Sequence, residues 1–347
     1  MSVLITGVTG GVGKIAARRL HELGEEVIGF ASDGTEVPGV SAHHVGCISD
    51  FAALKIAMAG CDQVLHLAAY HMPYDAPEQE IFRINVGGTF NVFKACAELG
   101  VQRVTVASSP NAIGYNFGVD VRDMVYLPVD GAHPVYTTDP YSFSKQAIEE
   151  VGRYFYRRHG ISSVFLRFGL DFRSTIDEWM QGPGPGKVRR LRSKLDELLA
   201  LPKPAQVREV QRIEAEMNEA RRRAFAQMPP FKNGTEYVYE AFSEELVIWS
   251  YLVHNFVMYL DGRDLAAAVA CALHAPFEGT HNLFVADHKN MLGIPAAQLA
   301  ELLYPGARIE RHLLQGYDAL VDYRETERII GFRAQHTFMD YYETLYG

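Results

Sequence analysis

The chain has 347 residues, of which 48% are hydrophobic and 22% charged, and its formal net charge is −9 at pH 7. This composition is typical of a globular protein with a substantial core, and the acidic balance argues against general nucleic-acid binding. No apolar run reaches 18 residues, so we expect no membrane span, and a strand predicted from Val3 leaves no room for a signal peptide. The four scattered cysteines favour free thiols in a reducing cytoplasm, and no group of side chains predicts a metal site.

A glycine-rich turn follows the first predicted strand. The apolar run Val3-Leu4-Ile5 leads into Thr6-Gly7-Val8-Thr9-Gly10-Gly11-Val12-Gly13, and a helix-like stretch over 14–20 comes next. Gly7 allows a tight turn, Gly10 lets the backbone approach a phosphate, and Gly13 lets the helix pack close to the strand. The free N–H groups at the start of that helix then face an anion. The turn therefore predicts a dinucleotide pyrophosphate site, although glycines also occur in ordinary loops.

Short apolar strands alternate with helical patterns up to about residue 170. Strands are predicted at 26–30, 62–69, 103–107 and 163–167, and helices at 50–59, 84–99 and 144–158, with Asp50 as an N-cap. This alternation predicts an α/β fold with a doubly wound parallel sheet of the Rossmann type. Ligands of such a sheet bind at the carboxyl ends of its strands.

The composition changes from about residue 173. Gly182-Pro183-Gly184-Pro185-Gly186 is not expected to hold regular structure, and two runs with helical spacing follow, separated by Leu201-Pro202-Lys203-Pro204. They predict an inserted helical hairpin over about 187–228. Residues 187–226 contain eleven Lys or Arg and six Asp or Glu, a net charge of 11 − 6 = +5. Either this is a solvated helix face, or it is a lid or oligomer contact that also attracts an anionic substrate.

Beyond the hairpin, 256–259 is strand-like, 264–273 is helical and 281–286 is a further strand. No internal repeat is visible. We therefore expect a dinucleotide-binding domain over 1–170, completed by about 254–286. The substrate-binding region is expected to comprise 171–253 and 287–347.

A tyrosine and a lysine stand four residues apart at the start of a predicted helix. This spacing places Tyr141 and Lys145 on one face, where the ammonium is expected to lower the phenol pKa toward working pH. Ser108 and Ser109 follow the strand that ends at Ala107, so a hydroxyl there can bond to a substrate oxygen. Taken singly, an exposed helix pair and a turn-capping serine remain alternatives. Their order and spacing together favour a catalytic group.

Taken together, the motifs resemble those of the extended short-chain dehydrogenase/reductases, the group of the NAD-dependent epimerases and dehydratases. The matching segments are Thr6-Gly7-x-x-Gly10-x-x-Gly13, His66-Leu67-Ala68-Ala69, Asn85-Val86-Gly87-Gly88-Thr89, Ala107-Ser108-Ser109, Pro140-Tyr141-x-x-x-Lys145, Leu166-Arg167-Phe168, 259–266 and 322–332. The resemblance spans both ends of the chain and omits mainly the hairpin.

The resemblance implies a role for each matching residue. Tyr141 would be the general acid/base, Lys145 would hold the nicotinamide ribose and tune the tyrosine, and Ser109 would bind the reacting carbonyl or hydroxyl. The cofactor-binding residues expected are Gly7, Thr9, Gly10, Gly11, Val12, Gly13, Ser32, Asp33, Cys47, Ile48, Leu67, Ala68, Ala69, Asn85, Tyr141, Lys145 and Phe168. The substrate contacts expected are His71, Ser108, Ser109 and Asn111, although His71 also fits a solvated loop histidine.

Two departures from the family pattern concern the cofactor. The acidic residue usual at the end of the second strand is replaced by Ala31-Ser32-Asp33, so Asp33 would serve two positions later. No Lys or Arg lies between Ala31 and Glu36 to meet a 2′-phosphate, which favours NAD, while Lys14 leaves NADP open. Cys47 stands in the element that contacts adenine, where an Asp is usual.

Two further departures concern the substrate. Pro110-Asn111 replaces the Asp-Glu pair that drives water elimination in the dehydratases, which argues against a 4,6-dehydratase. Leu170 stands where nucleotide-sugar enzymes usually present an Asn, and Leu cannot make that hydrogen bond.

The prediction is an NAD(P)-dependent oxidoreductase that transfers a hydride at a secondary alcohol or ketone of a sugar-like or nucleotide-sugar substrate. The nearest alternative is an epimerase, an isomerase that acts through a transient keto intermediate with tightly bound NAD. A non-catalytic cofactor-binding scaffold is a third possibility. The family resemblance also implies a homodimer that pairs through the helices beginning near Ile84 and Tyr141.

Overall fold

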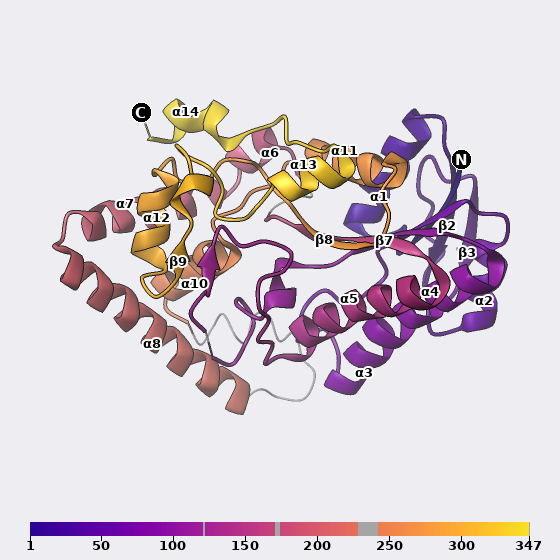
Figure 1. The fold of residues 1–347 in the computed structure, drawn as a ribbon, viewed down its shortest axis with the longest axis horizontal. Helices are drawn as coiled ribbons and strands as arrows, with labels where there is room; N and C mark the ends of the chain where they lie inside the picture. Colours follow the sequence, from indigo (N-terminus) through magenta and orange to yellow (C-terminus); the bar gives the residue numbers. More distant parts are fainter. Residues whose placement is uncertain (121, 171–173, 228–241, 347) are drawn as a thin grey trace.

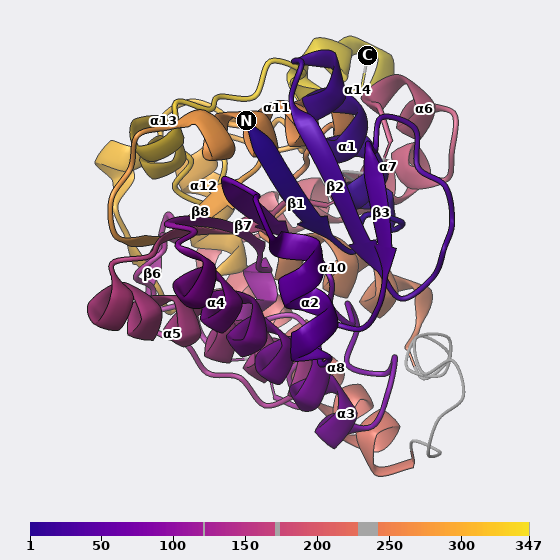
Figure 2. The ribbon, with the colours of Figure 1, turned by 90° about the vertical axis from the view of Figure 1, so that its right-hand side faces the viewer.

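The structure, a computed structural model, describes residues 1–120, 122–170, 174–227 and 242–346. Its centre is a parallel sheet with the strand order β3-β2-β1-β4-β5-β7-β8 (Figure 2). The strands are β1 (Ser2–Thr6), β2 (Glu26–Ala31), β3 (Ala42–Val45), β4 (Gln63–His66), β5 (Arg103–Ala107), β7 (Ser162–Phe168) and β8 (Thr280–Val285). The predicted α/β fold with a doubly wound sheet is confirmed, and β3 is a strand that the sequence pattern did not predict.

Helices cover both faces of the sheet (Figure 1). One face carries α1 (Gly11–Glu22), α11 (Gly262–His274) and α13 (Arg324–Ile330), and the other carries α2 (Phe51–Met58), α4 (Gly88–Leu99) and α5 (Pro140–His159). Successive residues of β1 alternate between the two cores: Val3 and Ile5 pack on one side and Leu4 on the other. Both faces are buried, which explains why the strands read as continuous apolar runs.

Two helices begin as their capping residues dictate. Asp50 Oδ1 accepts a hydrogen bond of 3.1 Å from Ala53 N, so the predicted N-cap of α2 is confirmed. Helix α5 begins at Pro140, four residues earlier than predicted, because Asp139 caps it and Pro is compatible with a first helical turn. Tyr141 therefore lies in the first turn of α5.

The helix predicted over 84–99 consists of two kinds of helix. A short helix, α3 (Glu78–Phe82), runs into a π-helix over Arg83–Gly87, and α4 follows directly. Such π-helical turns often occur at functional sites.

The far end of the molecule is mostly helical (Figure 1). It contains α6 (Ile176–Met180), α7 (Gly184–Leu199), α8 (Lys203–Gln227), α10 (Glu244–Leu252), α12 (Ala296–Leu303) and α14 (Tyr342–Tyr346), with a parallel pair of short strands, β6 (Tyr126–Leu127) and β9 (Arg308–Ile309). The expectation of irregular structure over 182–186 holds for Gly182 and Pro183 but is wrong for 184–186. Helix α7 begins at Gly184, because Pro185 occupies its first turn, where no backbone N–H is needed.

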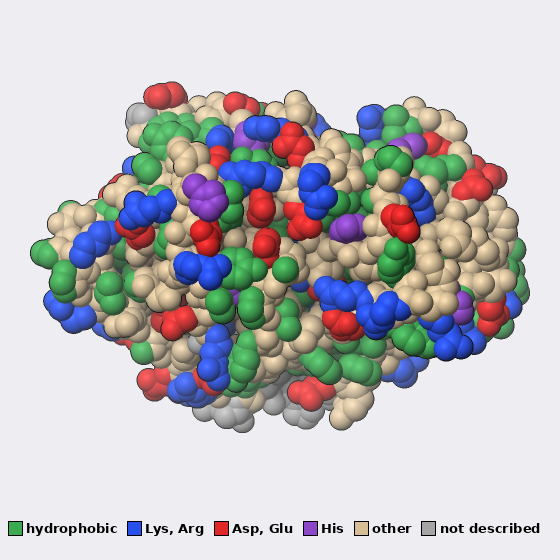
Figure 3. Space-filling model, viewed as in Figure 1, with side chains coloured by type: hydrophobic (Ala, Val, Ile, Leu, Met, Phe, Trp, Pro, Cys, Tyr) green, Lys and Arg blue, Asp and Glu red, His purple; other side chains and the backbone are tan. Residues whose placement is uncertain are grey.

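The predicted hairpin is present as α7 and α8, although residue 228 lies outside the described residues. Its apolar residues belong to the main core of this end, together with side chains of α10 and α12: Val188, Leu191, Leu195, Leu198, Val210, Ile213, Met217 and Ala220. Only the outer face is solvated, where Arg212 pairs with Glu209 and Glu216 at 3.0 and 2.6 Å. Lys and Arg side chains are interspersed with Asp and Glu over the face in Figure 3. The hairpin is therefore an integral part of the fold.

The strand predicted over 256–259 is wrong. These residues are buried, but Phe256 and Val257 have φ values of 59° and 52°, which an extended strand does not allow. The segment crosses the core as an irregular turn after a short 3-10 helix over Val253–Asn255. A short buried apolar run does not by itself distinguish a strand from such a crossing.

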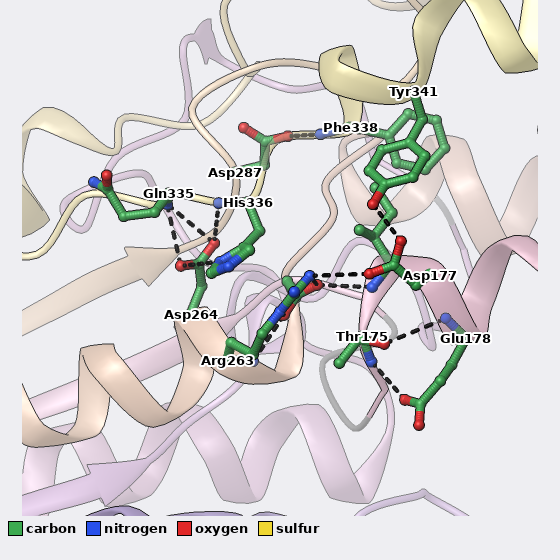
Figure 4. Close-up of polar contacts among 12 residues, drawn as sticks. Thr175, Asp177, Glu178, Arg263, Asp264, Asp287, Gln335, His336, Phe338 and Tyr341 are labelled. Carbon is green, nitrogen blue, oxygen red and sulfur yellow. Dashed lines mark hydrogen bonds and ion pairs between the residues drawn. The ribbon is translucent and has the colours of Figure 1, made fainter.

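Buried carboxylates hold the C-terminal segment against the rest of the chain (Figure 4). Asp264 accepts hydrogen bonds from the backbone N–H groups of Gln335 and His336, and Asp287 accepts one of 2.7 Å from Phe338 N. Burial raises the pKa of Asp287 to about 7.

None of the helices in the described ranges has the length and apolar character of a membrane span.

Candidate functional site

A cleft of about 390 Å³ opens at the carboxyl ends of β1 to β4. Its lining includes nine of the predicted cofactor residues: Gly7, Thr9, Gly10, Ser32, Cys47, Ile48, Leu67, Ala68 and Ala69. The structure thus brings together residues from four separate strand ends, as the strand-end rule for parallel sheets predicts.

The glycines of the turn are held in places where larger residues do not fit. Gly7 has φ of +73°, and a Cβ added to it would lie 2.8 Å from Ala68 N. A Cβ on Gly13 would lie 2.4 Å from Gly7 O. Gly10 caps α1, and the first backbone bond into the cap runs from Lys14 N to Gly10 O at 3.0 Å. The N–H groups of the preceding turn, Gly11 to Gly13, therefore remain available for a phosphate.

The ends of β2 and β3 form the opposite wall of the cleft. Ser32 lines it, whereas Asp33 is tied to the glycine turn through a 2.9 Å hydrogen bond from Thr9 Oγ1. Hydrogen bonds from Thr35 and Thr9 lower the pKa of Asp33, so a carboxylate stands beside the turn. Lys14 is exposed on α1, and Cys47 lines the cleft at the position of the adenine element.

A buried histidine links the turn to the π-helix. Thr6 Oγ1 accepts from Leu67 N and Ala68 N at 3.2 and 3.3 Å, and it therefore donates its proton to His66 Nδ1 at 2.7 Å. His66 Nε2 donates to Thr89 Oγ1 at 2.9 Å. Burial, with the nearby charge of Lys145, lowers the His66 pKa to about 3, so this imidazole is neutral. Sequence reasoning did not assign this relay, which fixes the backbone that lines the cleft.

Asn85 joins the cleft to α5. Its Oδ1 accepts from Tyr70 N at 2.8 Å, and its Nδ2 donates to Tyr70 O at 3.0 Å and to Ser144 Oγ at 2.9 Å. The side chain is 1% exposed. It therefore fixes the loop after β4 relative to the helix that carries Tyr141 and Lys145.

Tyr141, Ser109 and Lys145 meet at the carboxyl end of β5. Tyr141 and Ser109 share a hydrogen bond, and Lys145 Nζ lies 5.7 Å from the centre of the Tyr141 ring. Lys145 Nζ donates to Ala107 O, the last residue of β5, at 2.7 Å. All three side chains are buried. A phenol, a hydroxyl and an ammonium in this arrangement can bind a substrate oxygen and move its proton.

The expected lowering of the Tyr141 pKa by Lys145 is wrong. Burial raises the Tyr141 pKa to about 12, which outweighs the opposite effect of the Ser109 hydrogen bond, and Asp139 and Asp75 raise it further. Burial also lowers the Lys145 pKa to about 8, against the charge of Glu149. Tyr141 is therefore protonated at neutral pH, and Lys145 loses its proton at a pH only slightly above neutral.

The predicted substrate contacts fall in different surroundings. Ser108 Oγ donates to Glu149 Oε1 at 2.7 Å, so the structure gives this hydroxyl a structural partner and not a free place in the cleft. The side chain of His71 is 76% exposed and pairs with Asp75. Asn111 N donates to Ser109 Oγ at 3.1 Å, and in the described part of the chain Asn111 Oδ1 has no partner. Only Ser109 and Asn111 lie together with Tyr141.

Phe168 ends β7 and packs in the core that contains β1 and α1, and it does not line the cleft. The structure also adds cleft residues that the motifs did not predict, namely Phe30, Ala31, Gly46, Tyr70, Glu80, Arg83 and Ile84. Arg83 is held by Glu80 through two hydrogen bonds of 2.7 Å. The sequence signal for Arg83 was its position two residues before the predicted cofactor residue Asn85, because both residues then lie on the same helical segment.

The sheet order, the glycine turn and the Ser109, Tyr141 and Lys145 group define a short-chain dehydrogenase/reductase. A solved protein of that superfamily from Agrobacterium tumefaciens, with bound NAD, covers 99% of this chain and 96% of its own. The TM-score is 0.61 at 22% identity, so this likeness concerns the fold.

Sequence comparison identifies the family. The model of the NAD dependent epimerase/dehydratase family matches residues 3–170. An NAD-dependent glucose-6-phosphate dehydrogenase of Haloferax volcanii is 32% identical over 183 residues, which are 48% of this chain and 67% of that enzyme. A UDP-glucose 4-epimerase of Halalkalibacterium halodurans is 26% identical over 51% of this chain and 54% of its own. The chain belongs to the NAD dependent epimerase/dehydratase family, an enzyme family whose cofactor is NAD.

Proposed function

We propose that this protein is an NAD-dependent oxidoreductase that transfers a hydride at a secondary alcohol or ketone of a sugar-like substrate. The observation that carries the proposal is the meeting of Ser109, Tyr141 and Lys145 beside a cleft lined by the glycine turn. The dehydrogenase among the relatives acts on a phosphorylated sugar by its name, which supports a carbohydrate substrate.

The residues of the cleft fit NAD. A glycine turn that leaves no room for Cβ atoms and the free N–H groups at the start of α1 suit a pyrophosphate. The carboxylate of Asp33 beside that turn suits a ribose hydroxyl and repels a 2′-phosphate, which favours NAD over NADP. Arg83 also lines the cleft, so a cation is available there for the 2′-phosphate of NADP. The cofactor supplies the hydride acceptor or donor when it is bound.

The protein side chains would bind the substrate oxygen and move its proton. Ser109 donates a hydrogen bond to that oxygen, and Tyr141 donates the proton to a carbonyl or accepts it from a hydroxyl. Lys145, with a pKa of about 8, places an ammonium near the phenol at neutral pH. Asn111 offers a buried oxygen next to Ser109, without a hydrogen-bond partner among the described residues, for a second polar group of the substrate.

The second candidate is an epimerase that keeps its NAD and acts through a transient keto intermediate. It is favoured by the epimerase among the relatives, since the same three side chains serve both reactions. The test is to incubate the purified protein with NAD and a panel of glucose 6-phosphate, glucuronate, L-arabinose and UDP-glucose. Absorbance at 340 nm that rises steadily indicates a dehydrogenase. A changed sugar without net NADH indicates an epimerase, and no change of either kind contradicts both.

We also propose a cytoplasmic homodimer. Exposed aromatic side chains lie on the helices expected to pair and on α3 directly before them: Phe82 of α3 and Phe143 stack with ring centres 5.7 Å apart, and Phe90 and Tyr154 are 40% and 38% exposed. Such a row of exposed rings suits an interface. The four free cysteines are compatible with a reducing compartment.

We propose the following division into domains: residues 1–170 with 254–286 bind the cofactor, and residues 171–253 with 287–347 bind the substrate.

A further inference from the structure

The inserted helix α8 carries a buried arginine toward the site. Arg221 is 2% exposed, and its Nη1 donates to the carbonyl oxygens of Tyr115 and Gly118 at 3.4 and 3.1 Å. Its Nη2 donates to Ser250 Oγ at 3.4 Å and to His254 Nδ1 at 2.7 Å. One guanidinium thus connects the hairpin to the segment 115–118 and to the helix α10 region. The planar fork of Arg suits several acceptors at fixed angles.

The positive charge of Arg221 is balanced through a histidine. Glu214, on the same face of α8, has both carboxylate oxygens 3.1 Å from His254 Nε2. Burial holds the pKa of His254 below its usual value, so the imidazole is neutral and can accept from Arg221 while it donates to Glu214. Trp249 Nε1 also donates to Glu214, at 2.8 Å. A buried charge is tolerated when it is compensated and hydrogen-bonded in this way.

The segment that Arg221 holds reaches the catalytic phenol. The ring of Phe117 packs edge-on against Tyr141, with centres 5.8 Å apart. Between Phe117 and α8 lies a cavity of only about 20 Å³, room for about one water molecule, lined among others by Arg221, Phe225 and Ser250. The burial of Tyr141 therefore depends on a wall whose outer support is the inserted helix.

We propose that the inserted hairpin is part of the substrate site and that Arg221 is a positioning residue, which holds Phe117 against Tyr141. This inference rests on the proposed role of Tyr141 as the proton-transferring group. It replaces the two expectations for the hairpin, a solvated face or a lid, with a fixed wall. The positive charge of the hairpin matters here through one buried guanidinium and not through its exposed cations.

The test measures Tyr141 without any substrate. Protein labelled with 3-fluorotyrosine is titrated by ¹⁹F NMR, and the Tyr141 resonance is the one missing from a Tyr141→Phe variant. Arg221→Lys keeps the charge but cannot hold both carbonyl groups and both side chains with one ammonium. Phe117 then loosens, water reaches the phenol, and the ionisation constant of Tyr141 rises at least tenfold. Asp75, Asp139 and Lys145, which face or neighbour Tyr141, are unchanged in this variant.

The matched control is Arg222→Lys, because Arg222 is exposed and pairs with Asp120 on the surface. It leaves the Tyr141 titration unchanged. If Arg221→Lys does not fold, Phe117→Leu gives the same shift by removing the ring directly. In a folded double variant that combines Arg221→Lys with Phe117→Leu, the Tyr141 titration shifts no further than in either single variant. An unchanged Tyr141 titration in Arg221→Lys or in Phe117→Leu overturns the proposal, and so does a strictly additive double variant.

The affinity for NAD separates this proposal from the proposed function. NAD binding, followed by fluorescence, stays within twofold of wild type in Arg221→Lys, because the cleft residues lie on other elements. A loss of NAD affinity as large as the change in the Tyr141 ionisation constant would mean general disruption of the fold and would contradict a positioning role. A wild-type protein that reduces no NAD with any sugar would contradict the proposed function, yet the Tyr141 titration would still decide the role of Arg221.

Discussion

The proposed cofactor side and the proposed substrate side of this molecule are built in different ways. At the cofactor side, the backbone turns tightly at glycines and helix α1 begins with free N–H groups. At the substrate side, a buried charged group holds segments that are far apart in sequence, as Arg221 of the inserted hairpin does with the segment 115–118. The first side depends on residues that have no side chain, and the second depends on side chains with several partners.

This difference teaches where each side tolerates change. A Cβ at a crowded glycine meets backbone atoms that cannot move away, so even alanine is excluded there. A buried ion pair tolerates neither loss of one partner nor exposure, because the remaining charge is left without compensation. The two sides therefore differ in which single substitutions harm stability and which harm binding.

The largest expected loss of stability comes from breaking the Glu149 cluster. Glu149 binds Arg167 through two hydrogen bonds of 3.0 and 2.8 Å and also accepts from Ser108 and Asn282. Glu149→Ala should lower the free energy of unfolding by about 4 kcal/mol, because Arg167 is left buried and unpaired. Urea unfolding of Glu149→Ala and wild type measures this loss of unfolding free energy. Glu150→Ala, at an exposed site one residue later, is the control and should cost less than about 1 kcal/mol; equal losses would contradict the account.

A methyl group at Gly13 should harm the cofactor side more selectively. Its Cβ would lie 2.4 Å from Gly7 O, so the turn must shift away from the phosphate-binding geometry. Gly13→Ala should lower the unfolding free energy by about 3 kcal/mol and remove measurable NAD binding in calorimetry. Gly87→Ala is the control: nothing lies within 4 Å of its added Cβ, and helical Ala is favourable by about 0.5 kcal/mol. Normal NAD binding by Gly13→Ala would show that the turn is not the pyrophosphate site.

Lys145→Met sharpens the comparison through pH. The pKa of Lys145 is about 8 in the folded protein and 10.5 in the reference state, so keeping this buried lysine charged costs stability below pH 8. The cost is relieved as pH rises from 8 to 10.5. Met removes it but also loses the bond to Ala107 O, so the variant should be more stable than wild type by about 2 kcal/mol at pH 7.

The advantage of Lys145→Met should shrink as pH approaches 10, as thermal unfolding at several pH values would reveal. Lys94→Met, at a site that is 49% exposed, should change the stability neither at pH 7 nor near pH 10. A Lys145→Met protein less stable than wild type at pH 7 would mean that the ammonium is compensated in the folded state.

Local sequence signals predicted the local structure around the glycine turn well. The glycine turn, the N-cap at Asp50 and the serine at the end of β5 each depend on neighbours within a few residues, and the structure has them at strand ends. The same holds for Tyr141 and Lys145, whose spacing fixes their shared helix face. Their protonation was not predictable, because burial of Tyr141 depends on Phe117 and on the insertion.

Contacts between distant segments could not be predicted in the same way, because the two partners are far apart in sequence. Arg221 and Tyr115 are 106 residues apart, and no periodicity links them. His66 reaches Thr89 across 23 residues, and its neutral state follows from burial that a motif does not reveal. The buried run over 256–259 has the composition of a strand, but core packing imposes left-handed turns at Phe256 and Val257.

The central claim is that Tyr141 moves the proton while the glycine cleft holds NAD. It is tested most directly by comparing wild type with Tyr141→Phe in two assays on the same preparations: NAD affinity by calorimetry, and NADH formation at 340 nm with the sugar that wild type oxidises fastest. We predict NAD affinity within about threefold of wild type and turnover reduced at least about a hundredfold, since only the proton-transferring hydroxyl is removed. Turnover close to wild type in Tyr141→Phe would contradict the claim.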